Sequence, residues 1–309
     1  MVSFPSKNPP IERGVRPVPD SPTPMVSRRW LAAELRSLRE KADKTLDEVA
    51  VVLECSRAKV SRIERAQVSV RPLEVEAMLT FYGVSSQERE ELVQLAREAR
   101  RKSWWHEFRD LDQDSALKQV AFVDNETAAT SIRTYQTVLV FGLFQTEDYA
   151  RAVLRAIRLD LPQKEIDRHI ELRMKRQKLL DQDALPELWV VLDEAVLRRP
   201  VGGPDIMRQQ LNHLSEIADH PKVKLQVLPY GVGEHAGLDG AFMILGFSEQ
   251  GLLGTTEMDL ISLENTLSDQ YLRELTAVTR YIALFEAICR EAYGIERSQE
   301  FIAEIGKEI

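Results

Sequence analysis

The chain has 309 residues, of which 44% are hydrophobic and 29% are charged, and its formal net charge at pH 7 is −8. This length predicts two domains, and the composition is that of a globular protein. No apolar run reaches the ~18 residues of a transmembrane helix, and no signal peptide is expected. The two cysteines, Cys55 and Cys289, lack metal-ligand spacing, so we expect a reduced cytoplasmic protein without a metal or other cofactor.

The charge is divided unevenly along the chain. Residues 1–102 contain 19 Lys and Arg and 15 Asp and Glu, a net charge of +4, and the remainder therefore carries −12. Because an acidic body repels nucleic acid, any DNA contact is expected on a small basic surface of the first part.

The first segment, residues 1–26, contains seven prolines and has no apolar periodicity. This composition predicts a disordered arm. A helical pattern begins at Ser27, and its apolar stripe consists of Leu31, Leu35, Leu38 and Ala42.

Four more short helices are expected before residue 102. Capping and first-turn residues mark where these helices start: Thr45 with Glu48, Ser56, Pro72, and Ser85 with Glu88. The predicted first domain is therefore an all-α unit of five helices at 27–102.

The third of these helices is basic on its outer face. Val60 and Ile63 share one side of it, and the other side shows small, polar and basic residues. Only Glu54 and Cys55 separate the second helix from Ser56, so the two helices must cross steeply. This geometry is typical of the helix-turn-helix, whose second helix enters the major groove of DNA N-terminus first.

The stretches "RRWLAAELRSLREKADKTLDEVA", "CSRAKVSRIERAQ" and "LTFYGV" within residues 28–83 resemble the XRE (Cro/lambda-repressor-like) helix-turn-helix family. Two positions depart from that pattern. The family usually has Gly in the turn, where this chain has Glu54, and often has Gly after the recognition helix, where this chain has Ala66. Gly is favoured there because a positive φ costs it little.

The positions on the third helix predict which residues contact DNA. Arg57 and Arg62 can make bidentate contacts with guanine edges, and Ala58 can pack on a thymine methyl group. The remaining predicted contacts are with phosphates, from Ser56, Lys59, Arg71 and Arg28.

The second part of the chain, 103–309, mixes strand and helix patterns. Strands are predicted at 187–195, 222–230, 241–247 and 257–264, and helices at 164–182, 204–219, 269–292 and 296–307. Alternation along 222–230 predicts a half-buried strand with Lys224 and Gln226 exposed. The expected fold class is an all-α helix-turn-helix domain followed by an α+β domain, a mixed sheet with flanking helices.

The stretches "SWWHEF", "SIRTYQTVLVFGLFQTEDYARAVL", "LWVVLDEAVLRRPVGG" and "LQVLPYGVGEHAGLDGAFMILGF" are similar to the C-terminal domain of WhiJ-like actinobacterial regulators. The similarity covers about 104–290. Such regulators are often encoded beside a small partner protein, and some are antitoxin-like. The resemblance therefore implies a small protein partner from an adjacent gene.

The loop "GVGEHAGLDG" is the candidate partner or ligand site of the second domain. His235 with Asp239 would allow acid–base chemistry, but a turn that shapes a binding surface is the favoured interpretation. The Trp104–Trp105 pair is expected in core or interface packing. No residue is assigned a catalytic role.

These features predict a sequence-specific, DNA-binding transcriptional regulator that is not an enzyme. We expect a homodimer on an inverted repeat of double-stranded DNA, with recognition helices roughly 34 Å apart. The C-terminal domain would bind a small protein or effector, and no membrane contact is expected. Two alternatives remain open: an antitoxin-like protein that neutralises a small partner and regulates its own gene, and an enzyme with an accessory DNA-binding domain.

Overall fold

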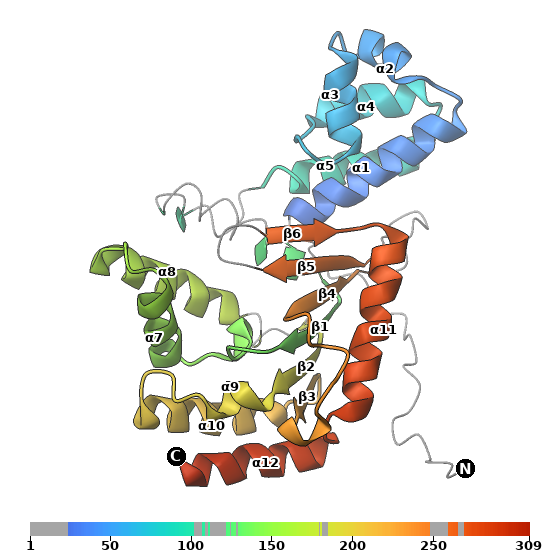
Figure 1. The fold of residues 1–309 in the computed structure, drawn as a ribbon. Coiled ribbons are helices and arrows are strands. Elements are labelled where there is room, and N and C mark those ends of the chain that lie inside the picture. The colour runs from blue at the N-terminus through green and yellow to red at the C-terminus, as the bar shows by residue number, and fades with distance from the viewer. Residues whose placement is uncertain are drawn as a thin grey trace, which may run out of the picture.

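The computed structural model shows a helical domain followed by a mixed sheet with flanking helices, which confirms the predicted fold class (Figure 1). The helical domain lies beyond the edge of the sheet that strand β6 forms. The residues that the structure describes are 24–101, 107–108, 111, 122–123, 125–127, 129–178, 180, 185–247, 259–264 and 269–309.

Between residues 24 and 98 the chain forms the five expected helices. Their bounds are α1 Pro24–Lys41, α2 Leu46–Val52, α3 Arg57–Glu64, α4 Pro72–Phe81 and α5 Ser86–Glu98. Helix α1 begins three residues before the expected start at Ser27, and the rest of the predicted arm, residues 1–23, lies outside the described residues. The predicted stripe of α1 packs into the core, with Leu31 and Leu35 buried and Leu38 partly buried.

The predicted helix starts are confirmed. The Thr45 hydroxyl accepts a hydrogen bond from the Glu48 backbone N–H, and the Glu48 carboxylate accepts one from the Thr45 N–H in return. The Ser85 hydroxyl likewise accepts a hydrogen bond from the Glu88 N–H at the start of α5, but the Glu88 carboxylate accepts from the Ser85 hydroxyl rather than from its backbone N–H. Pro72 occupies the first turn of α4. These local bonds satisfy backbone N–H groups that a helix leaves without partners at its start.

The second domain is built on six strands in the described part of the chain. Their bounds are β1 Ser131–Gln136, β2 Glu187–Asp193, β3 Val223–Leu228, β4 Phe242–Gly246, β5 Leu260–Glu264 and β6 Asp269–Leu272. The strand order is β3-β2-β1-β4-β5-β6. Strands β1, β2 and β3 are parallel, and β4, β5 and β6 continue the sheet with antiparallel pairing.

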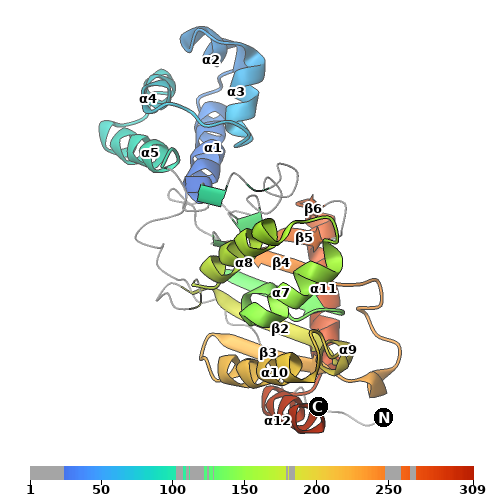
Figure 2. The ribbon, with the colours of Figure 1, turned by 90° about the vertical axis from the view of Figure 1, so that its left-hand side faces the viewer.

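Helices cover both faces of this sheet. Helices α7 and α8 lie on one face and α11 lies on the other, while α10 and α12 pack near the β3 edge (Figure 2). Because both faces are covered, Val190, Val191 and Leu192 of β2 are all buried in succession. The bounds are η2 Gly142–Phe144, α7 Glu147–Ile157, α8 Gln163–Gln177, α9 Glu194–Arg198, α10 Pro204–Ala218, η3 Tyr230–Val232, α11 Leu275–Glu291 and α12 Ile295–Glu308.

Three sequence predictions for this domain were wrong or incomplete. The single helix expected at 269–292 is divided, because residues 269–272 pair with β5 as strand β6 and only then does α11 begin. Strand β1, which joins the parallel and antiparallel halves of the sheet, was not predicted. Gln226 is buried rather than exposed, and its side chain bonds to Trp189 and to the Tyr293 carbonyl.

One arginine of α1 contacts the second domain. The Arg29 guanidinium lies 5.6 Å from the centre of the Phe247 ring and also donates a hydrogen bond to Asn125. Phe247 directly follows β4 and is buried. A guanidinium over an aromatic face is favourable because the ring carries negative charge on its face.

Candidate nucleic-acid interface

Helix α3 starts at the predicted cap. Ser56 has extended backbone geometry, and its hydroxyl accepts a hydrogen bond from the Lys59 N–H at 3.2 Å. The turn from α2 is as short as expected, and Ala50, at the crossing of the two helices, is buried. The first turn of α3 is therefore fixed by local bonding before any ligand is present.

The two positions where the XRE family favours Gly have the backbone conformation that Gly favours. Glu54 has φ 48° and Ala66 has φ 56°, both in the left-handed region. A side chain in this region costs roughly 1–2 kcal/mol. The turns of the helix-turn-helix thus keep their geometry without Gly, and the surrounding packing must offset the cost.

The two faces of α3 differ as predicted. Val60 and Ile63 are buried, at 0% and 1% exposure. Arg57, Ala58 and Arg62 are exposed, with Ala58 and Arg62 nearly opposite the buried side and Arg57 at its flank. The face that carries the predicted base contacts is therefore open to solvent, while the other face anchors the helix to the domain core.

A buried ion pair fixes α3 against α1. Arg39 donates to both carboxylate oxygens of Glu64, at 2.7 and 2.9 Å, and also to the Lys44 carbonyl at 2.9 Å. The Glu64 side chain is only 5% exposed. Burial raises the pKa of the neighbouring Tyr82 hydroxyl, and the Glu64 charge raises it further. Neither Arg39 nor Glu64 was singled out in the sequence, because the pair joins residues from separate helices.

A second ion-pair group joins α3 to α4. The Lys59 ammonium lies 2.7 Å from a Glu74 oxygen, and the Arg71 guanidinium donates to the same oxygen at 3.0 Å. Burial alone would raise the pKa of Glu74, but hydrogen bonds from Arg71 and Lys59 outweigh it, and the pKa falls from 4.5 to about 2. Lys59 and Arg71, both predicted as phosphate contacts, thus lie together and share a carboxylate.

The last predicted phosphate contact, Arg28, lies elsewhere. Its guanidinium donates to the Ala99 carbonyl, near the end of α5. Arg39, which contacts α3, is eleven residues further along α1, roughly 16 Å at the rise of an α-helix. The structure therefore does not bring Arg28 together with the exposed face of α3.

The candidate loop of the second domain holds His235 and Asp239 apart. His235 accepts a hydrogen bond on Nδ1 from the Gly237 N–H, and its ring meets the Tyr135 ring edge-on at 5.9 Å. Asp239 instead lines a pocket against α11. The two side chains are directed at different neighbours, so the acid–base pair considered from the sequence is not formed.

Gly237 lets this loop rest on β1. A Cβ at this position would lie 2.3 Å from a carbon of the Tyr135 ring, closer than atoms can approach. Tyr135 is buried, and its hydroxyl donates to Asp193 at 3.0 Å. The loop is therefore seated on a fixed aromatic ring, which the spacing of the loop glycines did not reveal.

Both parts of the chain match models of known families. Residues 119–304, more than half of its length, match the family described as a domain of unknown function (DUF5753). The chain belongs to the DUF5753 family. Residues 30–92 match the model of a helix-turn-helix domain, which supports a DNA-binding regulator. No curated protein and no solved structure matches the chain.

Two kinds of feature are absent from the described residues. Within them, no group of three or more His, Cys, Asp or Glu side chains is arranged to hold a metal ion. In the same part of the DUF5753 chain, no helix is long and apolar enough to cross a bilayer. The Trp104–Trp105 pair, for which packing was predicted, lies outside these residues.

Removing one partner of the Arg39–Glu64 pair should destabilise the helical domain strongly. Arg39→Ala leaves the Glu64 charge buried without its bidentate donor, and we expect a loss of about 3–5 kcal/mol in the free energy of unfolding. The double change Arg39→Met and Glu64→Leu removes both charges and should recover most of that loss. Denaturant unfolding of the three proteins measures this, and equal stability of Arg39→Ala and wild type would contradict the assignment.

The Glu74 group should make stability depend on acid pH. Its pKa is about 2 in the folded protein and near 4.5 when unfolded, so its contribution is complete above the unfolded value and disappears as the pH falls toward 2. Glu74→Gln should therefore be less stable than wild type at neutral pH, and the difference should shrink below about pH 4.5. The exposed Glu76→Gln, in the same helix, serves as the control and should show no such convergence.

Proposed function

We propose that this DUF5753 protein is a sequence-specific transcriptional regulator that reads DNA with α3. The observation that carries the proposal is the exposure of Arg57, Ala58 and Arg62 on a helix whose opposite face is buried. The Arg57 side chain is 67% exposed, and its guanidinium lies 3.9 Å from the Asp47 carboxylate, whose side chain is also exposed. A guanidinium held this loosely can turn to a guanine edge.

Phosphate contacts would flank this face. Ser56 is exposed at the N-terminus of α3, where backbone N–H groups and the helix dipole favour an anion. Lys59 and Arg71 share Glu74, so two positive charges surround one negative charge at this place. That group keeps a net positive charge, which supports a phosphate contact beside the major groove. The proposed role of Arg28 has no such support, because it bonds to the end of α5.

We further propose a homodimer on an inverted repeat, with a C-terminal domain that binds a small protein encoded by an adjacent gene. The dimer would place two α3 helices one DNA turn apart, roughly 34 Å. The partner proposal rests on the similarity to WhiJ-like regulators and on the acidic balance of the second domain, which favours a basic partner. We propose no catalytic role, since His235 and Asp239 have different neighbours.

The recognition face can be tested with matched double variants. We expect Arg57→Ala with Arg62→Ala to lose about 1–3 kcal/mol of operator affinity for each arginine that contacts a base, with little change on unrelated DNA. The control is Arg36→Ala with Arg97→Ala, which removes the same charge from exposed positions of α1 and α5. Fluorescence anisotropy with promoter DNA of the protein's own gene, at two salt concentrations, measures both. Equal losses on operator and unrelated DNA would refute base reading by α3.

The partner proposal has its own test. The purified protein and the product of the adjacent small gene should form a complex without DNA, seen as a single species in sedimentation velocity. The mass of the protein alone in the same experiment should be that of a dimer. If the two proteins sediment separately, the partner proposal fails, while DNA binding in the anisotropy experiment remains a separate result.

A further inference from the structure

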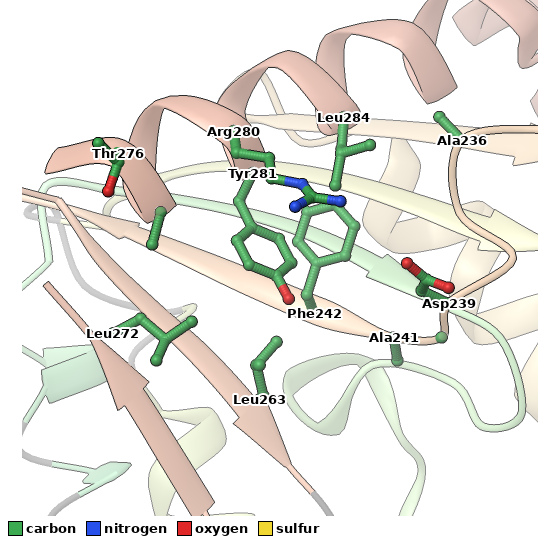
Figure 3. Close-up of a pocket in the computed structure, with 12 residues that line it drawn as sticks. Ala236, Asp239, Ala241, Phe242, Leu263, Leu272, Thr276, Arg280, Tyr281 and Leu284 are labelled. Carbon is green, nitrogen blue, oxygen red and sulfur yellow. The ribbon is translucent and has the colours of Figure 1, made fainter. Parts of the chain in front are cut away.

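The second domain has a pocket beside α11 that contains Asp239 and has no part in the function proposed above. Its volume is about 750 Å³, and it lies between α11, strands β4 to β6 and the loop at 236–241 (Figure 3). This volume is within the roughly 300–1,000 Å³ of pockets that hold drug-sized ligands. The space is therefore large enough for a small organic molecule.

The floor of the pocket is apolar. Phe242 of β4 and Tyr281 of α11 meet with ring centres 5.1 Å apart, and Leu263 and Leu272 extend the apolar surface along β5 and β6. Phe242 is only 4% exposed, so its ring is part of the domain core as well as the floor. Such a surface is suited to an aliphatic or aromatic group of a ligand.

Two opposite charges stand above this floor. The Asp239 carboxylate comes from the loop and the Arg280 guanidinium from α11, and Figure 3 shows both directed into the same space. Both residues are exposed, and no ion pair between them occurs in the described chain. The two groups therefore lie further apart than a salt bridge and retain their hydrogen-bonding capacity.

This arrangement restricts the charge of a ligand. A simple anion is attracted by Arg280 and repelled by Asp239. A simple cation is attracted by Asp239 and repelled by Arg280. A molecule with one charge of each sign satisfies both groups, provided that its charges are separated as the two side chains are. In a single amino acid the ammonium and carboxylate groups are bonded to the same α-carbon. In a short peptide they lie at the two ends of the chain, further apart.

We propose that this pocket binds a short zwitterionic peptide with apolar side chains. Its terminal ammonium pairs with Asp239, its terminal carboxylate pairs with Arg280, and its side chains lie on Phe242 and Tyr281. The loop that carries Asp239 needs little ordering on binding, because Gly237 is seated against the buried Tyr135 ring. A preformed site loses less conformational entropy when it binds.

The test uses the full chain and the dipeptide leucyl-phenylalanine, measured by isothermal titration calorimetry. We expect saturable binding that weakens about ten-fold or more when the dipeptide is N-acetylated or C-amidated, since each change removes one charge-assisted hydrogen bond. Asp239→Asn and Arg280→Gln should weaken the unmodified dipeptide by a similar factor. The controls are Glu234→Gln in the same loop and Arg290→Gln in α11, both exposed and outside the pocket lining.

Each possible result of this titration either supports or contradicts the proposal. No saturable binding, or equal affinity for the wild type and both pocket variants, would overturn the proposal. Equal binding of the acetylated and free dipeptides would overturn the zwitterionic assignment and leave an anion site at Arg280. The assay contains neither DNA nor the small protein partner, so its result does not depend on the function proposed for α3.

Discussion

The stability of the helix-turn-helix domain depends on how the buried Glu64 carboxylate is paired. Glu64 ends α3, the helix proposed to read DNA, and its carboxylate is almost fully covered. A buried carboxylate costs several kcal/mol unless it is paired and hydrogen-bonded. Arg39 satisfies both oxygens in the fork geometry that guanidinium provides, and the same side chain also bonds to the Lys44 carbonyl after α1. One residue thus orients α3 and closes the α1–α2 connection.

The way α3 is held determines how several other residues of the domain are placed. With Val60 and Ile63 in the core and Glu64 fixed by α1, the rotation of α3 is determined, and Arg57 and Arg62 must face solvent. The Lys59–Glu74 pair then sets the start of α4. Glu54 and Ala66 have left-handed backbone conformations that neither residue prefers by itself, so the packing of the domain must offset their cost.

Strand β4 connects the two regions for which binding is proposed. Its first residue, Phe242, forms the floor of the pocket beside α11. Directly after its last residue comes Phe247, over which the Arg29 guanidinium of α1 lies. Only residues 243–246 of this strand therefore separate the pocket residue Phe242 from the contact at Phe247. The core of a protein is close-packed, so a strand of this kind is a short and stiff connection.

The sequence by itself determined the features that depend on neighbouring residues. Caps at Thr45 and Ser56 and the apolar sides of α1 and α3 were predictable, because helix capping and periodicity act within one or two turns. Only the tertiary structure decided the features that depend on distant residues. The Arg39–Glu64 pair joins residues of two separate helices, and the different surroundings of His235 and Asp239 come from Tyr135 and from the pocket beside α11, so no local pattern encodes these contacts. Strand β6 pairs with the neighbouring strand β5, and the helical pattern of its sequence concealed that pairing. Burial of Gln226 followed from the same cause, since its partners lie on other elements.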